Sequence, residues 1–192
     1  AVLYAAEFDY VPGRMDEVCA ALDKESFDYR IGSVHYVDGF AFDDPDCIGG
    51  WDAFGRDRVW DRYLDLLREF VERHSFEILA HADLPKKFGF RPSRPDLVEN
   101  RFEEIFRIAA KKGVCLELNT AGLRCPCAEI YPAPNLVRLA RKAGMRISLA
   151  SDAHKPSDVG RDFDRAIALA KDAGFASASV FCSRELIPLP FD

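Results

Sequence analysis

Several hallmarks of other protein classes are missing from this sequence of 192 residues. No apolar run approaches the roughly 18 residues that a transmembrane helix requires. The net charge of −6 gives no basic surplus that would favour a nucleic-acid partner. The opening AVLYAAE lacks the basic region of a signal peptide and soon reaches a carboxylate. These absences predict a cytoplasmic protein that has neither a membrane nor a nucleic acid as its partner.

Cysteine pairs and glycine motifs are also scarce. The six cysteines are scattered, and the pair Cys125 and Cys127 has no second pair at the spacing of a structural zinc site. A reduced setting is therefore favoured. No G-x-G-x-x-G motif supports a dinucleotide site. With 48% hydrophobic and 30% charged residues, the composition is that of an ordinary globular protein, and the length suits one domain over residues 1–192.

Apolar segments with strand character alternate with segments of helical periodicity. Strands are expected over Val2–Tyr10, Tyr29–Tyr36, Phe76–His81, Val114–Asn119, Arg146–Ser151 and Ser177–Cys182. Helices are expected over Met15–Lys24, Trp51–His74, Asp96–Lys112, Pro134–Ala143 and Pro156–Ala173. This alternation predicts an α/β protein built from parallel βαβ units. Six strands suit a distorted, TIM-like parallel (β/α) barrel that lacks its first strand or strands, and an open doubly wound sheet is the alternative.

Three of the four histidines fall at the ends of expected strands. The candidate metal ligands are Glu7, His35, His81, Asp152 and His154. In parallel α/β folds, functional residues gather at the carboxyl ends of the strands. A single histidine there is more often structural, but the set of imidazoles and carboxylates suits zinc, manganese or iron. Asp152 and His154 can serve one site only if the chain bends after the strand, because alternate side chains point to opposite faces.

Two further segments resemble anion receptors. Lys86, Lys87 and Arg91 lie in the loop after His81, and Arg124 closely follows the fourth strand. Lysine and arginine bind phosphate through charge-assisted hydrogen bonds, and the guanidinium fork gives two in parallel. A solvated basic loop is the alternative for the lysines. Arg124 is the stronger candidate phosphate ligand.

The strand-end motifs, taken in order, resemble those of histidinol-phosphatases of the PHP (polymerase and histidinol phosphatase) family. The motifs are GSVHYVDGFAFDDP, AHADLPKKFG, ELNTAGLRCPCAEIYP and SDAHKPSDVG. The resemblance implies a distorted barrel with up to three divalent metal ions, which hydrolyses the small phosphate ester L-histidinol phosphate in histidine biosynthesis. By position, it assigns the five candidate ligands to the metals, with Glu7 as the bridging carboxylate, and Arg124 to the phosphate. In the mechanism that we expect, Asp152 orients the nucleophile.

One departure from the family pattern stands out, because the H-x-H strand that opens the family is absent. We therefore expect an upstream segment of the same protein to pair beside Val2–Tyr10 and to supply further histidines. Two alternative functions remain open. The first is a PHP phosphoesterase that acts on another ester such as a nucleotide. The second is an inactive PHP-like binding module.

Overall fold

A five-stranded parallel sheet organises the computed structural model, which describes residues 2–191. Its strands, in spatial order, are β1 (Ala5–Asp9), β2 (Tyr29–Ser33), β5 (Ile78–Leu79), β6 (Cys115–Asn119) and β7 (Arg146–Ala150). This order follows the sequence without the reversal that defines a doubly wound sheet. The α/β prediction is therefore confirmed, with barrel-type strand succession in a sheet that does not close on itself.

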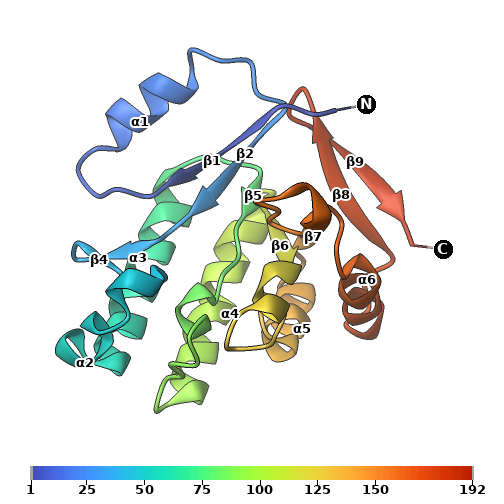
Figure 1. Ribbon diagram of the computed structural model, residues 1–192. Coiled ribbons are helices and arrows are strands. Elements are labelled where there is room, and N and C mark those ends of the chain that lie inside the picture. Colours follow the sequence, from blue (N-terminus) through green and yellow to red (C-terminus); the bar gives the residue numbers. More distant parts are fainter. Residues whose placement is uncertain (1, 192) are drawn as a thin grey trace.

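Six α-helices occur in the described chain (Figure 1): α1 (Met15–Leu22), α2 (Gly50–Phe54), α3 (Arg56–Arg73), α4 (Pro95–Lys111), α5 (Pro134–Ala143) and α6 (Phe163–Asp172). Helix α4 packs between α3 and α5, so these helices succeed one another along the sheet as the strands do. The single helix expected over Trp51–His74 is wrong at one point. Gly55, with φ of +80°, ends α2 and begins α3. Such a positive φ is readily adopted only by glycine.

Helix α3 holds β2 in place through a close contact. Its buried face includes Trp60, Leu64, Leu67 and Val71, as the helical spacing predicts. Where β2 crosses this face, a Cβ on Gly32 would lie 2.6 Å from the Phe70 ring, so only glycine fits there. This contact fixes the end of β2, from which the following loop leaves toward the site.

Short 3₁₀ turns and two small hairpins complete the chain. The turns are η1 (Pro45–Cys47), η2 (Leu84–Lys86), η3 (Thr120–Arg124) and η4 (Pro156–Asp158), and β3 (Tyr36–Val37) pairs with β4 (Phe40–Ala41). The expected sixth parallel strand, β8 (Ser177–Cys182), instead pairs antiparallel with β9 (Glu185–Pro190). Ser183 and Arg184 both have positive φ, which suits the tight turn of a hairpin. No helix between residues 2 and 191 has the length and apolar composition needed to cross a membrane.

Strand β1 is shorter and more exposed than expected. Only Ala5–Asp9 is strand, and Val2 is fully exposed. Phe8 and Tyr10 are buried, because they pack on the Phe70 ring of α3. Within the described residues, β1 is an edge strand with β2 as its neighbour. The pairing of a further segment with β1 stays a prediction.

Candidate metal and phosphate site

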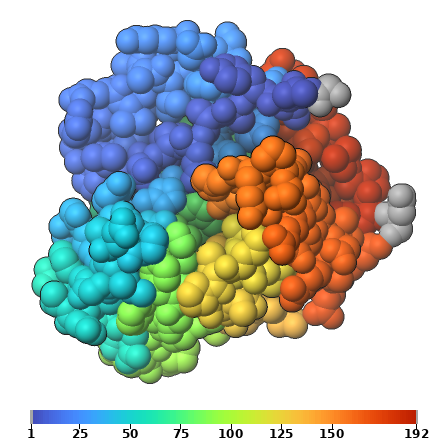
Figure 2. Space-filling model, viewed as in Figure 1, coloured from blue at the N-terminus to red at the C-terminus, as the bar shows by residue number. Residues whose placement is uncertain are grey.

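The carboxyl ends of the parallel strands open into a cavity of about 520 Å³. The space-filling view is hollowed between the blue N-terminal part and the orange segment near residues 150–160 (Figure 2). All five predicted metal ligands line this cavity: Glu7, His35, His81, Asp152 and His154. The structure thus brings together side chains that lie on four different strand ends, as the strand-end argument predicts.

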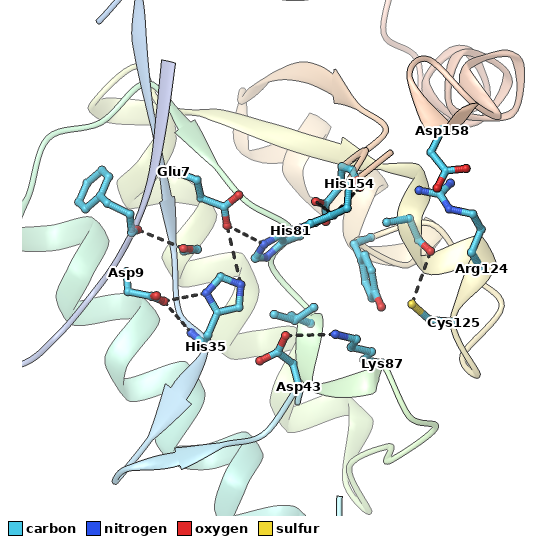
Figure 3. Close-up of a pocket in the computed structure, with 16 residues that line it drawn as sticks. Glu7, Asp9, His35, Asp43, His81, Lys87, Arg124, Cys125, His154 and Asp158 are labelled. Atoms are coloured by element: carbon cyan, nitrogen blue, oxygen red, sulfur yellow. Dashed lines mark hydrogen bonds and ion pairs between the residues drawn. The ribbon is translucent and has the colours of Figure 1, made fainter. Parts of the chain in front are cut away.

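Glu7, His35 and His81 form the tightest group in the cavity (Figure 3). One potential ligand atom from each lies within 4.8 Å of the other two. Glu7 Oε1 is 3.1 Å from His81 Nε2 and 3.8 Å from His35 Nε2. A carboxylate and two imidazoles at such separations are a suitable donor set for a divalent transition metal.

Asp9 orients one of these imidazoles. Its Oδ1 lies 2.7 Å from His35 Nδ1 and also accepts the His35 backbone N–H at 3.1 Å. A proton on Nδ1 leaves Nε2 as the lone-pair nitrogen that faces Glu7, and metal-binding histidines commonly have such a partner. Asp9 was not among the residues predicted from the sequence. Its signal was the spacing of two residues from Glu7, which places both side chains on one face of β1.

Two strand exits have left-handed backbone. His81 has φ of +42° and Asp152 has φ of +49°. Non-glycine residues rarely adopt this region, and when they do they often lie at functional sites. The turn at Asp152 is the bend that the D-x-H motif requires. His154, with a side chain 89% exposed, lies at the cavity rim with its Nδ1 3.5 Å from Asp152 Oδ1.

The electrostatics of the cavity favour a cation. Burial alone would lower the pKa of His81, but the carboxylates of Glu7, Glu117 and Asp152 outweigh it and raise the pKa to about 9. Burial raises the pKa of Glu117 to about 7, despite the nearby His81 and a hydrogen bond from Asn119. A metal-binding imidazole is neutral, so a divalent cation would take the place of the proton on His81. The donor set therefore fits a metal.

Positive side chains occupy the opposite side of the cavity (Figure 3). Arg124 lines the cavity beside Asp158, and its side chain is held by hydrogen bonds from Nη2 to the Ser151 carbonyl at 2.6 Å and from Nη1 to the Thr120 carbonyl at 3.3 Å. Lys87 also lines it and donates to Asp43 at 3.2 Å. An anion in the cavity would therefore have the Glu7 group on one side and Arg124 on the other.

Two predicted phosphate contacts lie elsewhere, which is a correction. Lys86 is fully buried, and its Nζ lies 2.8 Å from Asp83, 3.1 Å from Glu129 and 2.8 Å from the Ile130 carbonyl. These oxygens use all three ammonium donors. Arg91 forms an ion pair with Glu129 at 3.1 Å. Neither Lys86 nor Arg91 lines the cavity. Of the basic loop, only Lys87 reaches it.

Several known proteins resemble this chain in sequence. The family model described as the PHP domain matches residues 1–121. A Deinococcus radiodurans protein named "Probable histidinol-phosphatase" is 36% identical over 168 residues, which cover 88% of this chain and 63% of that protein. The "Histidinol-phosphatase" of Lactococcus lactis is 26% identical over 180 residues, with coverage of 88% and 64%. The chain thus spans less than two thirds of the length of these relatives.

A solved structure shows the same fold. The crystal structure of histidinol phosphate phosphatase from Lactococcus lactis, complexed with zinc, L-histidinol and phosphate, gives a TM-score of 0.77 at 20% sequence identity. The match covers 94% of this chain and 70% of that chain. The predicted PHP-type architecture is confirmed by this likeness. Because the PHP model also matches more than half of the residues, the chain belongs to the PHP domain family.

Proposed function

We propose that this chain forms the metal-binding catalytic part of a phosphatase that hydrolyses L-histidinol phosphate to L-histidinol and inorganic phosphate. The observation that carries the proposal is one cavity with Glu7, His35 and His81 on one side and Arg124 on the other. Its volume of about 520 Å³ suits a small ligand. The relatives support the substrate, because the Lactococcus lactis structure contains L-histidinol and phosphate.

The metal is proposed to be zinc, as in that relative, with Glu7, His35, His81, Asp152 and His154 as its ligands. Manganese or iron, and up to three ions, remain part of the proposal. When bound, divalent zinc supplies Lewis acidity and lowers the pKa of a coordinated water toward neutrality. Glu7 contributes negative charge to this side of the cavity, and Asp9 keeps Nε2 of His35 free to bind.

The opposite side would hold the phosphoryl group. The Arg124 guanidinium, fixed by two backbone carbonyls, and the Lys87 ammonium offset negative charge on the phosphoryl oxygens. Asp152 is proposed to accept a hydrogen bond from the attacking water through Oδ1, because its Oδ2 already accepts from Asn119 at 3.3 Å. This arrangement orients the water toward phosphorus without a strong separate base.

The test is phosphate release by the full-length protein loaded with zinc, with L-histidinol phosphate compared against AMP and p-nitrophenyl phosphate. We expect the highest kcat/KM for L-histidinol phosphate, and loss of turnover in Glu7→Gln. A preference for AMP would replace the proposed substrate with a nucleotide. Zinc binding without hydrolysis of any of the three esters would overturn the enzymatic proposal and favour a binding module.

A further inference from the structure

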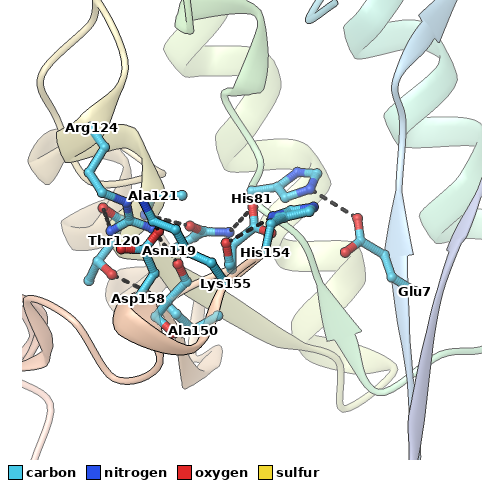
Figure 4. A network of polar contacts seen from close by, with 12 residues as sticks. Glu7, His81, Asn119, Thr120, Ala121, Arg124, Ala150, His154, Lys155 and Asp158 are labelled. Carbon is cyan, nitrogen blue, oxygen red and sulfur yellow. Dashed lines mark hydrogen bonds and ion pairs between the residues drawn. The ribbon is translucent and has the colours of Figure 1, made fainter.

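Asn119 is a buried residue at the end of β6 whose polar groups are all used. Its backbone N–H donates to the Tyr131 carbonyl at 2.7 Å, and its carbonyl accepts the Tyr131 N–H at 2.9 Å. Its side-chain Nδ2 donates to Glu117 at 3.1 Å and to Asp152 at 3.3 Å, and its Oδ1 accepts the Ala121 N–H at 2.8 Å. Figure 4 shows Asn119 between the His81–His154 side and the turn that carries Arg124.

These contacts form part of a closed circuit, in which hydrogen bonds are joined by the backbone from Ser151 to Asp152 and from Thr120 to Ala121. Asn119 binds Asp152, and the carbonyl of the preceding Ser151 accepts from Arg124 at 2.6 Å. Arg124 in turn donates to the Thr120 carbonyl at 3.3 Å, and the next residue, Ala121, donates to Asn119. The circuit joins the exits of β6 and β7. A displacement of any one member would therefore shift the others.

The chemistry of this position requires a primary amide. Two carboxylates, Glu117 and Asp152, approach from one side and need donors, while the Ala121 N–H approaches from the other side and needs an acceptor. Only asparagine and glutamine offer two donors and an acceptor on one neutral group. The extra methylene of glutamine would not fit the closely packed space around Asn119, which is 1% exposed.

We propose that Asn119 is a positioning residue that fixes Asp152, on the metal side, relative to the η3 turn and Arg124, on the phosphate side. This proposal rests on the proposed phosphatase function, because it assigns roles to both sides of the same cavity. In this proposal, Asn119 contacts neither the substrate nor the metal. Its effect passes through the orientation of Asp152 and Arg124.

Two variants of the full-length protein separate positioning from mere stability. Asn119→Leu removes every side-chain hydrogen bond at similar volume. The double variant Glu117→Gln/Asn119→Leu also neutralises the buried carboxylate that Asn119→Leu alone leaves without its donor, so it removes the main cost to folding. It does not restore the donor to Asp152. Asn135→Asp is the matched control, since Asn135 also donates to a glutamate, at 2.6 Å, but on the exposed surface.

The readouts are the melting temperature, calorimetric binding of inorganic phosphate to the zinc-loaded protein, and kcat/KM. We expect the double variant to recover the melting temperature lost in Asn119→Leu. Its phosphate affinity and kcat/KM should nevertheless stay about 10- to 100-fold below wild type, the scale of a lost hydrogen bond to a charged group. Asn135→Asp should match wild type in all three measurements.

The outcomes are distinguishable from failure of the proposed function. If the double variant recovers phosphate affinity and kcat/KM together with its melting temperature, Asn119 is only structural and the proposal is overturned. If wild type binds phosphate but does not hydrolyse L-histidinol phosphate, the substrate is wrong, and the loss of phosphate affinity in both variants still supports the positioning role. Should Asn119→Leu fail to fold, the double variant alone decides between these outcomes.

Discussion

Two charged clusters surround His81 and Asp83, which lie two residues apart in the sequence. They differ in whether they are open to a ligand. Around His81, the carboxylates of Glu7 and Asp152 line a cavity and that of Glu117 is buried. Despite the burial of His81, these carboxylates raise its pKa to about 9. Around Asp83, the ammonium of Lys86 fills the centre of the cluster and is bound by three oxygens. One cluster has a surplus of negative charge open to a ligand, whereas the other is closed.

The difference shows how a single cation decides between structure and function. Buried carboxylates need a compensating charge, because desolvation of unpaired ions is costly. The chain supplies that charge for Asp83 through Lys86, whose ammonium also lies 5.3 Å from the Tyr131 ring centroid. Near His81, Glu7 is exposed and Glu117 is the buried carboxylate. Within the Glu7 group, the described residues supply no lysine or arginine, only histidines that can exchange a proton for a metal. The negative charge around the Glu7 group must therefore be compensated by a bound cation, and this need distinguishes the candidate metal site from the Asp83 cluster.

The largest effect should come from His81→Ala. Loss of this ligand is expected to reduce zinc content and to lower kcat/KM by about 1000-fold, since a catalytic metal contributes several kcal/mol and about 1.36 kcal/mol is a factor of ten. Metal analysis and steady-state kinetics on the full-length protein measure both. His74→Ala is the matched control, because His74 lies at the end of α3 outside the cavity. Full zinc content and full turnover in His81→Ala would remove it from the metal site.

Lys86→Met tests the closed cluster. Removing one partner of a buried ion pair is expected to cost about 3–5 kcal/mol in free energy of unfolding. Urea denaturation measures this loss, with the exposed Lys24→Met as control. The double variant Lys86→Met/Asp83→Asn should be less destabilised, because it leaves fewer unpaired charges. If Lys86→Met kept its stability but bound inorganic phosphate more weakly, Lys86 would belong to the phosphate side after all.

Comparison of the two clusters also explains what the sequence could predict. Strand-end positions marked Glu7, His35 and His81, because parallel strands deliver their carboxyl ends to one edge of a sheet. The roles of Lys86 and Arg91 were not predictable in this way. Their partner Glu129 lies 43 residues from Lys86 in the sequence, and nothing in a local basic loop indicates which lysine will be buried.

The fold, too, could be predicted from the sequence only in part. Alternating periodicity predicted the parallel strands and most helices, since burial repeats every two or every three to four residues. The hairpin of β8 and β9 was missed, because ELIPLP contains two prolines that argue against a strand. As a hairpin partner, β9 has no strand on its other side within residues 2–191, so its prolines need not donate there. Glu117 was missed because a single carboxylate in a strand carries no local signal of its partners, whereas Asp9 had a signal in its spacing of two residues from Glu7.

Arg124→Ala tests the side of the cavity that faces the metal group. The substitution removes one charge-assisted contact to phosphate and is expected to lower kcat/KM by tens-fold, equivalent to about 1.5–3 kcal/mol. Inhibition by inorganic phosphate should weaken in parallel, while zinc content stays unchanged. Arg138→Ala is the control, because Arg138 forms an exposed ion pair with Asp172 and does not line the cavity. An unchanged kcat/KM would show that Arg124, like Lys86, is a structural cation.

The smallest effect is expected for Asp9→Asn, which weakens the open cluster without removing a ligand. An asparagine oxygen can still accept from His35 Nδ1 and from the His35 backbone N–H, so the imidazole should keep its orientation. The substitution removes only the negative charge of Asp9, which makes the His35 imidazole a stronger metal ligand. Partners of metal-binding histidines contribute about 10- to 100-fold in affinity, and we expect the low end of that range for zinc. Competition with a chromophoric chelator measures the zinc affinity. Asp9→Ala, which also frees the ring to rotate, should lose more, and equal affinities in wild type and both variants would show that Asp9 does not orient His35.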